Sequence, residues 1–250
     1  AMYVSAAIIF GGLVFPGVVN GTTGIPWKNY FRALRKPLIL TLATGQVMAG
    51  LPLLLQSFQI EVWNHLPGRK ATKDDFGPID AFAALGLSIF HFGKLLALMF
   101  MPFAGWFLDI PISQEKTLRM LITGIPATLG ATYFAIYTEL PRVGLPSTLA
   151  SLYSLNREWI MRFGDFLGYS GALTICCFIA TQSKGCWRVR AEKILLVGVC
   201  AVLTGTLLAK ASHAWLSSIL ASSHDAREMV LNRTSMVNAP NPVVLTSQNP

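Results

Sequence analysis

Residues 156–180 decide how this chain folds, because NREWIMRFGDFLGYSG at 156–171 runs directly into ALTICCFIA at 172–180. No helix breaker separates the polar first half from the apolar second half. Four charged side chains therefore lie in the first part of a helix whose second part is apolar enough to cross a membrane: Arg157, Glu158, Arg162 and Asp165.

The same helix extends well beyond the quoted stretch. Pro146 suits a first helical position, and the next helix breaker is Gly185. The segment 146–184 is therefore predicted to be one helix of roughly 58 Å, at ~1.5 Å per residue. A hydrocarbon core is only ~30 Å thick, so this helix must tilt, bend or project from the membrane. A second overlong helix is predicted at 191–222, and the two would form a terminal hairpin.

The composition is typical of a polytopic membrane protein. Of the 250 residues, 53% are hydrophobic and 13% are charged, and the mean hydropathy is +0.52. Soluble domains are about a quarter charged. We therefore predict an all-α membrane helical bundle of about five to six membrane helices over 1–222. A polar tail rich in Asn and Pro follows at 223–250, extended or bound to a partner.

Shorter apolar runs precede the terminal helices, at 2–19, 38–56, 79–108 and 118–137. Between the first two, the link 20–37 is basic and aromatic, and we expect it to lie in the membrane interface as an amphipathic segment.

The net charge of +8 comes from basic residues that sit mostly in short loops. This is the positive-inside pattern of membrane proteins, so we exclude nucleic acid as a partner. If all six runs cross the bilayer, the loops 21–37, 109–119 and 182–193 share one side, and both termini lie on the outer face.

Signatures of cofactors and catalysis are missing from the sequence. The cysteines form no CxxC motif, and there is no P-loop, HExxH or GxSxG. We expect no metal and no cofactor. One alternative makes His91 and His213 bis-imidazole haem ligands on two helices.

Arg162 is the sharpest feature of the sequence. An arginine cannot neutralise itself in a bilayer, so it must snorkel, pair, or face water or another protein. A local alternative is available, because Glu158 and Asp165 lie one turn away on either side and could pair with it near the interface.

Other polar residues on the apolar runs have two interpretations each. Lys94 and His91, and likewise Lys210 and His213, either snorkel to the interface or line an aqueous path. Glu192 is either a solvated acid at a helix start or part of that path. Four hydroxyl residues either line a wet groove or bond to their own helix: Ser170, Thr174, Thr204 and Thr206.

The terminal hairpin resembles subunit a of the rotary F-type ATP synthases. That family often shows a Ser-Leu-aromatic group, then the functional arginine, then small residues. Here Ser151-Leu152-Tyr153 precedes Arg162-Phe163 at the family's separation, and glycines follow at 164, 168 and 171. The segment 79–137 would match the pair of helices before the long ones. Phe166 and Gly171 stand where the family has an asparagine and a histidine or acid.

The resemblance implies a proton-translocating stator subunit. Arg162, with Arg157 as a rival, would face the carboxylate of a rotor-ring hairpin subunit between two half-channels and lower that carboxyl group's pKa. The candidate proton-path residues are Asp165, Ser170, Glu192, Thr204 and His213. The implied partners are the rotor ring, other subunits of a large membrane complex, and lipids. The implied location is the mitochondrial inner membrane; the first residue, which is not Met, fits a removed presequence or a cloning scar.

Two other functions stay open on the sequence alone. One is a structural accessory subunit of a respiratory-type membrane complex. The other is a small-solute transporter or channel, against which the lack of an internal repeat argues weakly.

Overall fold

The computed structural model describes residues 2–67, 76–88 and 92–221. All regular structure in these ranges is helical, which confirms the all-α prediction. The predicted tail at 223–250 and His91 lie outside the described residues.

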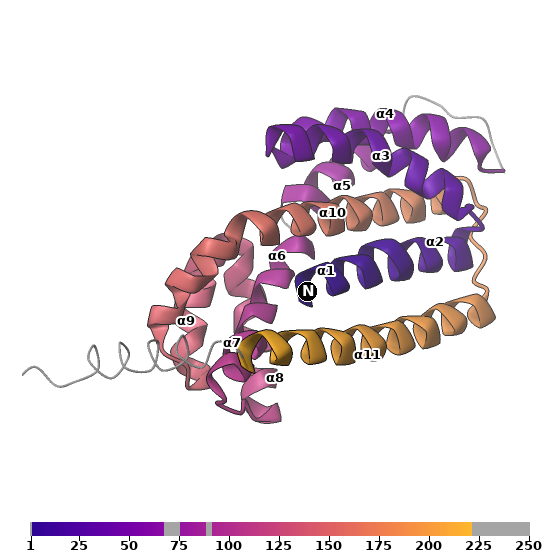
Figure 1. The fold of residues 1–250 in the computed structure, drawn as a ribbon. Coiled ribbons are helices and arrows are strands. Elements are labelled where there is room, and N and C mark those ends of the chain that lie inside the picture. The colour runs from indigo at the N-terminus through magenta and orange to yellow at the C-terminus, as the bar shows by residue number, and fades with distance from the viewer. Residues whose placement is uncertain (1, 68–75, 89–91, 222–250) are drawn as a thin grey trace, which may run out of the picture.

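The first helix runs through the middle of the molecule (Figure 1). It consists of α1 (Met2–Ala7), a π-helical segment (Ile8–Val14) and α2 (Phe15–Thr23). A helical hairpin follows and packs on one side. It is formed by α3 (Trp27–Thr44), a 3₁₀ turn (Val47–Gly50), α4 (Leu51–Glu61) and a second 3₁₀ turn (Trp63–His65).

Short helices make up the middle of the chain. These are α5 (Phe76–Ser88), α6 (Phe92–Leu96), a 3₁₀ turn (Ala97–Met99) and α7 (Phe100–Leu108). Next, α8 (Gln114–Gly130) and α9 (Thr132–Val143) pack against each other as a hairpin.

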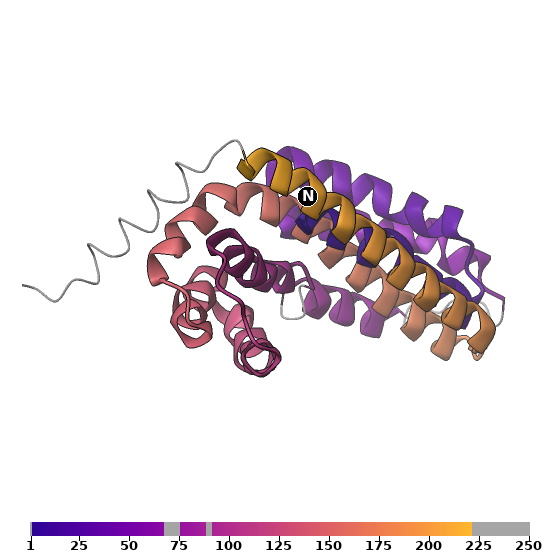
Figure 2. The ribbon, with the colours of Figure 1, turned by 60° about the horizontal axis from the view of Figure 1, so that its bottom comes forward.

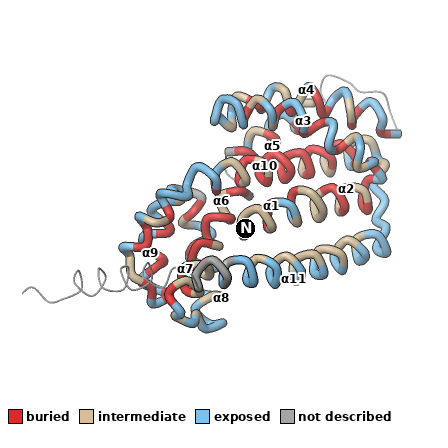
Figure 3. Tube along the Cα trace, viewed as in Figure 1, coloured by how far each residue is buried: buried red, intermediate tan, exposed pale blue. Residues whose placement is uncertain are grey.

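The two long helices complete the fold. After a 3₁₀ turn (Ser147–Leu149), α10 (Ala150–Ser183) spans 34 residues and contacts most other elements. Among the described helices, α10 is the most buried along its apolar half, whereas α11 (Ala191–Ala221) is largely exposed (Figure 3).

Three described stretches are long and apolar enough to cross a membrane: Tyr3–Thr23, Ser147–Ser183 and Ala191–Trp215. The predicted number of five to six membrane helices is not confirmed, because two predicted runs are interrupted. The run 38–56 is divided at Gly45, whose φ of 71° ends α3 in the left-handed region. The run 118–137 is divided at Ala131, whose extended backbone (φ −125°, ψ 111°) separates α8 from α9.

The predicted basic link at 20–37 contains the end of α2 and the first part of α3. Residues 27–44 form the single helix α3, with Pro37 inside it, and α3 packs along α10. The position of this link in the membrane interface stays a prediction.

The two long helices α10 and α11 are consecutive in the sequence, but in space the N-terminal helix lies between them (Figures 1 and 2). Glycines at 17 and 21 make a small-xxx-small face on α2 against which α11 packs. A Cβ added at Gly17 would come 2.5 Å from a methyl of Val197, and one at Gly21 would come 2.8 Å from Ile194. Small residues let membrane helices approach closely, so this face fixes α11 to α2.

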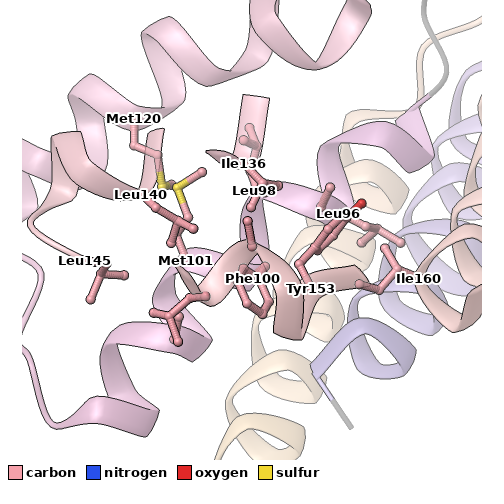
Figure 4. Close-up of a cluster of buried hydrophobic side chains, with 14 of the residues drawn as sticks. Leu96, Leu98, Phe100, Met101, Met120, Ile136, Leu140, Leu145, Tyr153 and Ile160 are labelled. Atoms are coloured by element: carbon pink, nitrogen blue, oxygen red, sulfur yellow. The ribbon is translucent and has the colours of Figure 1, made fainter. Parts of the chain in front are cut away.

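Two apolar cores share α10. The first surrounds its N-terminal half and includes Phe100, Ile136, Leu140 and Tyr153 (Figure 4). The second surrounds its C-terminal half and joins α3, α4 and α5 through residues such as Leu34, Phe58, Ile79 and Leu173. α10 is therefore the element that connects the two halves of the molecule.

Between the cores, α6 crosses α10 at a glycine pair. A Cβ built on Gly93 would collide with the backbone of Gly164, so only glycine fits at position 93 without movement of a helix.

We expect Gly93→Ala to destabilise the protein by about 1–3 kcal/mol, because overpacking of this size costs that much in a packed core. The measurement is thermal unfolding in detergent. Gly198→Ala is the matched control, since Gly198 lies on α11 with open space around its Cβ position, and Ala is the better helix former. Equal unfolding temperatures for the two variants would contradict the crossing.

Candidate functional site

Arg162 binds the end of a neighbouring helix. Its Nη1 donates hydrogen bonds to the carbonyl oxygens of Thr41 (3.2 Å) and Leu42 (2.9 Å) in the last turn of α3. The sequence suggested either a carboxylate on another protein or the local acids Glu158 and Asp165. In the structure the guanidinium is half-buried and its hydrogen-bond acceptors are backbone carbonyls.

The physical reason is the unsatisfied end of α3. The last four carbonyls of a helix lack intrahelical donors, and a cation near this end also interacts favourably with the helix dipole. Gly45 turns the chain away at this point, and the Arg162 guanidinium lies next to it. Arg162 therefore caps α3 from α10.

At the other end of α10, Lys184 likewise donates to backbone carbonyls of a neighbouring segment. Its Nζ donates to the carbonyls of Trp63 (2.7 Å) and Leu66 (3.1 Å) and lies 4.6 Å from the centre of the Trp63 ring. Both cations thus tie α10 to the ends of the α3–α4 hairpin.

Ser170, a predicted proton-path residue, lies in a buried polar contact between helices. Its hydroxyl donates to the carbonyl of Gly11 (3.3 Å), and its own carbonyl accepts from the Tyr30 hydroxyl (2.6 Å). One residue earlier, the Tyr169 hydroxyl accepts from Thr41 Oγ1 (2.9 Å) and donates to the carbonyl of Val47. These bonds fasten α3 and the N-terminal helix to α10.

Three further predicted path residues, Glu192, Thr204 and His213, lie on α11. Glu192 is exposed, Thr204 is half-buried, and the exposed His213 packs its ring edge-on to Trp106 at 5.8 Å. Because the N-terminal helix lies between α11 and α10, the structure does not bring these three residues together with Arg162, Asp165 or Ser170 (Figure 1). Their roles in a proton path stay predictions.

A cavity of about 580 Å³ lies beside the N-terminal half of α10. Three charged residues line it: Lys94 from α6, and Arg157 and Asp165 from α10. Most of the remaining lining is apolar, from Val47, Met48, Leu87, Ala97, Ile160 and Met161. Its size falls within the ~300–1,000 Å³ range of small-molecule sites, which are mostly apolar with a few polar groups.

The glycine crossing builds the inner wall of this cavity. Gly93 and Gly164 touch, and both line it. Their neighbours Lys94 and Asp165 are thereby held at the same wall. Asp165 is buried, with 3% of its surface exposed. Arg157 lies about two turns away along α10, roughly 12 Å, on the exposed side.

Two helix interruptions also open onto the cavity. One is the turn that begins at Gly45, which presents Val47 and Met48. The other is the break between α8 and α9, which presents Gly130, Ala131, Thr132 and Tyr133. The first N–H groups of α9 lie at this break, and a helix N-terminus favours negative charge. In a membrane, irregular backbone is tolerated where it lines a cavity.

Sequence reasoning found part of this site. It singled out Asp165 and Lys94 and named Arg157 as a rival to Arg162. It missed the break at 130–132, although Gly130, two residues before the β-branched Thr132, was an available signal. It also could not show that Lys94 and Asp165 share a wall.

Among the described residues, no group of three or more His, Cys, Asp or Glu is placed to hold a metal ion. His91 falls outside these residues, so the bis-histidine alternative stays a prediction.

A comparison of the chain with protein-family models, curated proteins and solved structures finds no match.

We expect Arg162→Gln to lower stability by about 1–2 kcal/mol, because a charge-assisted cap of α3 is lost. Thermal unfolding in detergent measures this loss. Arg119→Gln is the control: Arg119 forms a 2.7 Å pair with Glu115, but both side chains are about three-quarters exposed, and such pairs contribute little. An Arg162 variant as stable as the control would rule out the capping role.

Proposed function

We propose that this chain is a membrane-embedded small-solute protein whose cavity binds an amphiphilic organic anion and passes it through or along the membrane. The observation that carries the proposal is the 580 Å³ cavity, which is lined both by Arg157 and by the first residues of α9.

The anion preference follows from these two groups. Arg157 offers a planar fork of donors that matches a carboxylate or phosphate. The start of α9 adds backbone N–H groups and the positive end of its dipole. Together they would hold an acidic headgroup at the outer part of the cavity.

The apolar lining determines the size and polarity of the ligand's body, the part beyond its acidic headgroup. Ile160 and Met161 lie along α10 between Arg157 and the Lys94–Asp165 wall, and Leu87 and Ala97 face the same space. Over roughly 12 Å, this wall suits an aliphatic or aromatic body of about eight carbons. The Lys94–Asp165 wall would meet a second polar group, if the ligand has one.

Interrupted helices are a common feature of membrane transport sites, because they bring backbone donors and acceptors to membrane depth. The breaks at Gly45 and Ala131, both beside the cavity, support transport over passive storage of the ligand.

Octanoate is a suitable first probe. We expect it to raise the unfolding temperature of the full-length protein in detergent, because a ligand that binds only the folded state stabilises it. Octylammonium, with the same chain and opposite charge, should have a smaller effect.

Arg157→Gln should weaken octanoate binding about tenfold or more, as expected for loss of one charge-assisted hydrogen bond. Arg119→Gln should leave it unchanged. Equal stabilisation by octanoate and octylammonium, or normal octanoate binding by the Arg157 variant, would refute the proposal.

A rotary stator subunit is the second candidate, and its support is the sequence resemblance together with the position of Arg162. That side chain is half-buried and lies beside the exposed Leu42. A carboxylate arriving at this surface would compete with the α3 carbonyls for the guanidinium.

For the stator candidate, Arg162→Gln should abolish proton-driven ATP synthesis in native membranes while the complex still assembles. Normal synthesis by an assembled variant would exclude it. Purification of the native protein also separates the candidates, because a stator or accessory subunit would co-purify with a large assembly.

A further inference from the structure

One end of the helix bundle collects basic residues from segments far apart in the sequence. The α10–α11 link reaches back to the end of α2, where the N–H groups of Arg188 and Arg190 donate to the carbonyls of Thr22 (3.0 Å) and Gly21 (2.9 Å). Lys193 Nζ donates to Asn20 Oδ1 (3.2 Å). Since α3 begins just after α2 ends, its first residues lie at the same end.

We define the basic surface as the exposed cations of this end and of the adjoining outer face of α3. On α3 they follow helical spacing and share one side. The basic surface consists of Lys28, Arg32, Arg35, Lys36, Arg188, Arg190 and Lys193.

Acidic residues compensate little of this charge. In the described part of this end there are three, Glu61, Asp80 and Glu192. Arg32 lies 3.9 Å from Glu61 with about half of its side chain exposed, so most of the positive charge faces outward.

Tryptophans lie next to the basic surface. Trp187 is 44% exposed in the link and packs edge-on against Phe178 at 5.3 Å. Trp27 opens α3 and lies 6.3 Å from the partly exposed Phe31. Tryptophan is enriched at the level of lipid headgroups, so these side chains place this end at a membrane interface.

The length of α10 agrees with this placement. From Arg162 to Lys184 the helix rises roughly 33 Å, close to the ~30 Å thickness of a hydrocarbon core. The segment from Arg162 to Lys184 is therefore long enough to span that core, and the cations of α3 can snorkel toward the headgroups at their own end.

We infer that the basic surface binds the headgroups of anionic phospholipids, and that this end of the molecule faces the side of the membrane that retains positive loops. The inference is independent of the ligand in the cavity, because none of the seven cations lines it.

The test is native mass spectrometry of the full-length protein in neutral detergent. The protein is titrated with phosphatidylglycerol and with phosphatidylcholine of the same acyl chains. The expected result is preferential retention of phosphatidylglycerol. Arg188→Gln with Arg190→Gln should weaken that retention by up to about 25-fold, since each cation near an anionic surface contributes about fivefold in affinity.

This double variant should fold, because the structure shows the two backbone N–H groups, not the guanidinium groups, bonding α2. Arg35→Gln with Lys36→Gln is a second variant on a different element and should have a similar effect. The matched control is Arg119→Gln with Lys210→Gln, which removes two exposed charges outside the basic surface and should leave retention unchanged.

Equal retention of the two lipids by the unmodified protein would overturn the inference, and would be the result if the basic surface served an acidic protein instead. An equal loss in the control variant would also overturn it, by showing that net charge alone governs retention.

Discussion

Satisfaction of backbone carbonyls at interrupted helix ends is the constraint on which this structure depends. Where α3 stops at Thr44, its last carbonyls lack intrahelical donors. The Gly45 N–H and Arg162 of α10 both donate to the Thr41 carbonyl, and Arg162 also donates to the Leu42 carbonyl. A backbone group left without a partner in a hydrocarbon environment costs several kcal/mol, so such donors matter most where a helix end lies within a membrane. Lys184 serves the end of the α3–α4 hairpin in the same way.

These two caps determine the position of α10 relative to its neighbours. A helix that carries cations roughly 33 Å apart, each bound to a neighbour, is fixed in register against the α3–α4 hairpin. The buried hydroxyl contacts of Tyr169 and Ser170 lie between the two caps and reinforce that register. With α10 held, the Gly93–Gly164 crossing sets the position of α6, and the cavity forms where α6, α10 and the α8–α9 break meet.

The cavity and the basic surface use charge in different ways. In the cavity, cations and the buried Asp165 face a space of limited volume with apolar walls, where electrostatic interactions are stronger than in water. On the basic surface the cations are exposed, and their effect depends on the sum of many weak interactions with a charged leaflet. This difference is why we assign ligand selectivity to the first and membrane orientation to the second.

The amino-acid sequence by itself determined the helical class and the two long terminal helices, because low charge, long apolar runs and the positions of Pro146 and Gly185 are local properties. It also singled out Arg162 and Asp165, since a charge on an apolar helix is visible without a structure. Only the tertiary structure decided which groups these charges meet. Arg162 donates hydrogen bonds to two backbone carbonyls more than a hundred residues away, and carbonyls leave no signature in a sequence. The breaks at Gly45 and Ala131 and the insertion of the N-terminal helix between α10 and α11 depend likewise on packing between distant segments, which hydropathy along one chain does not record.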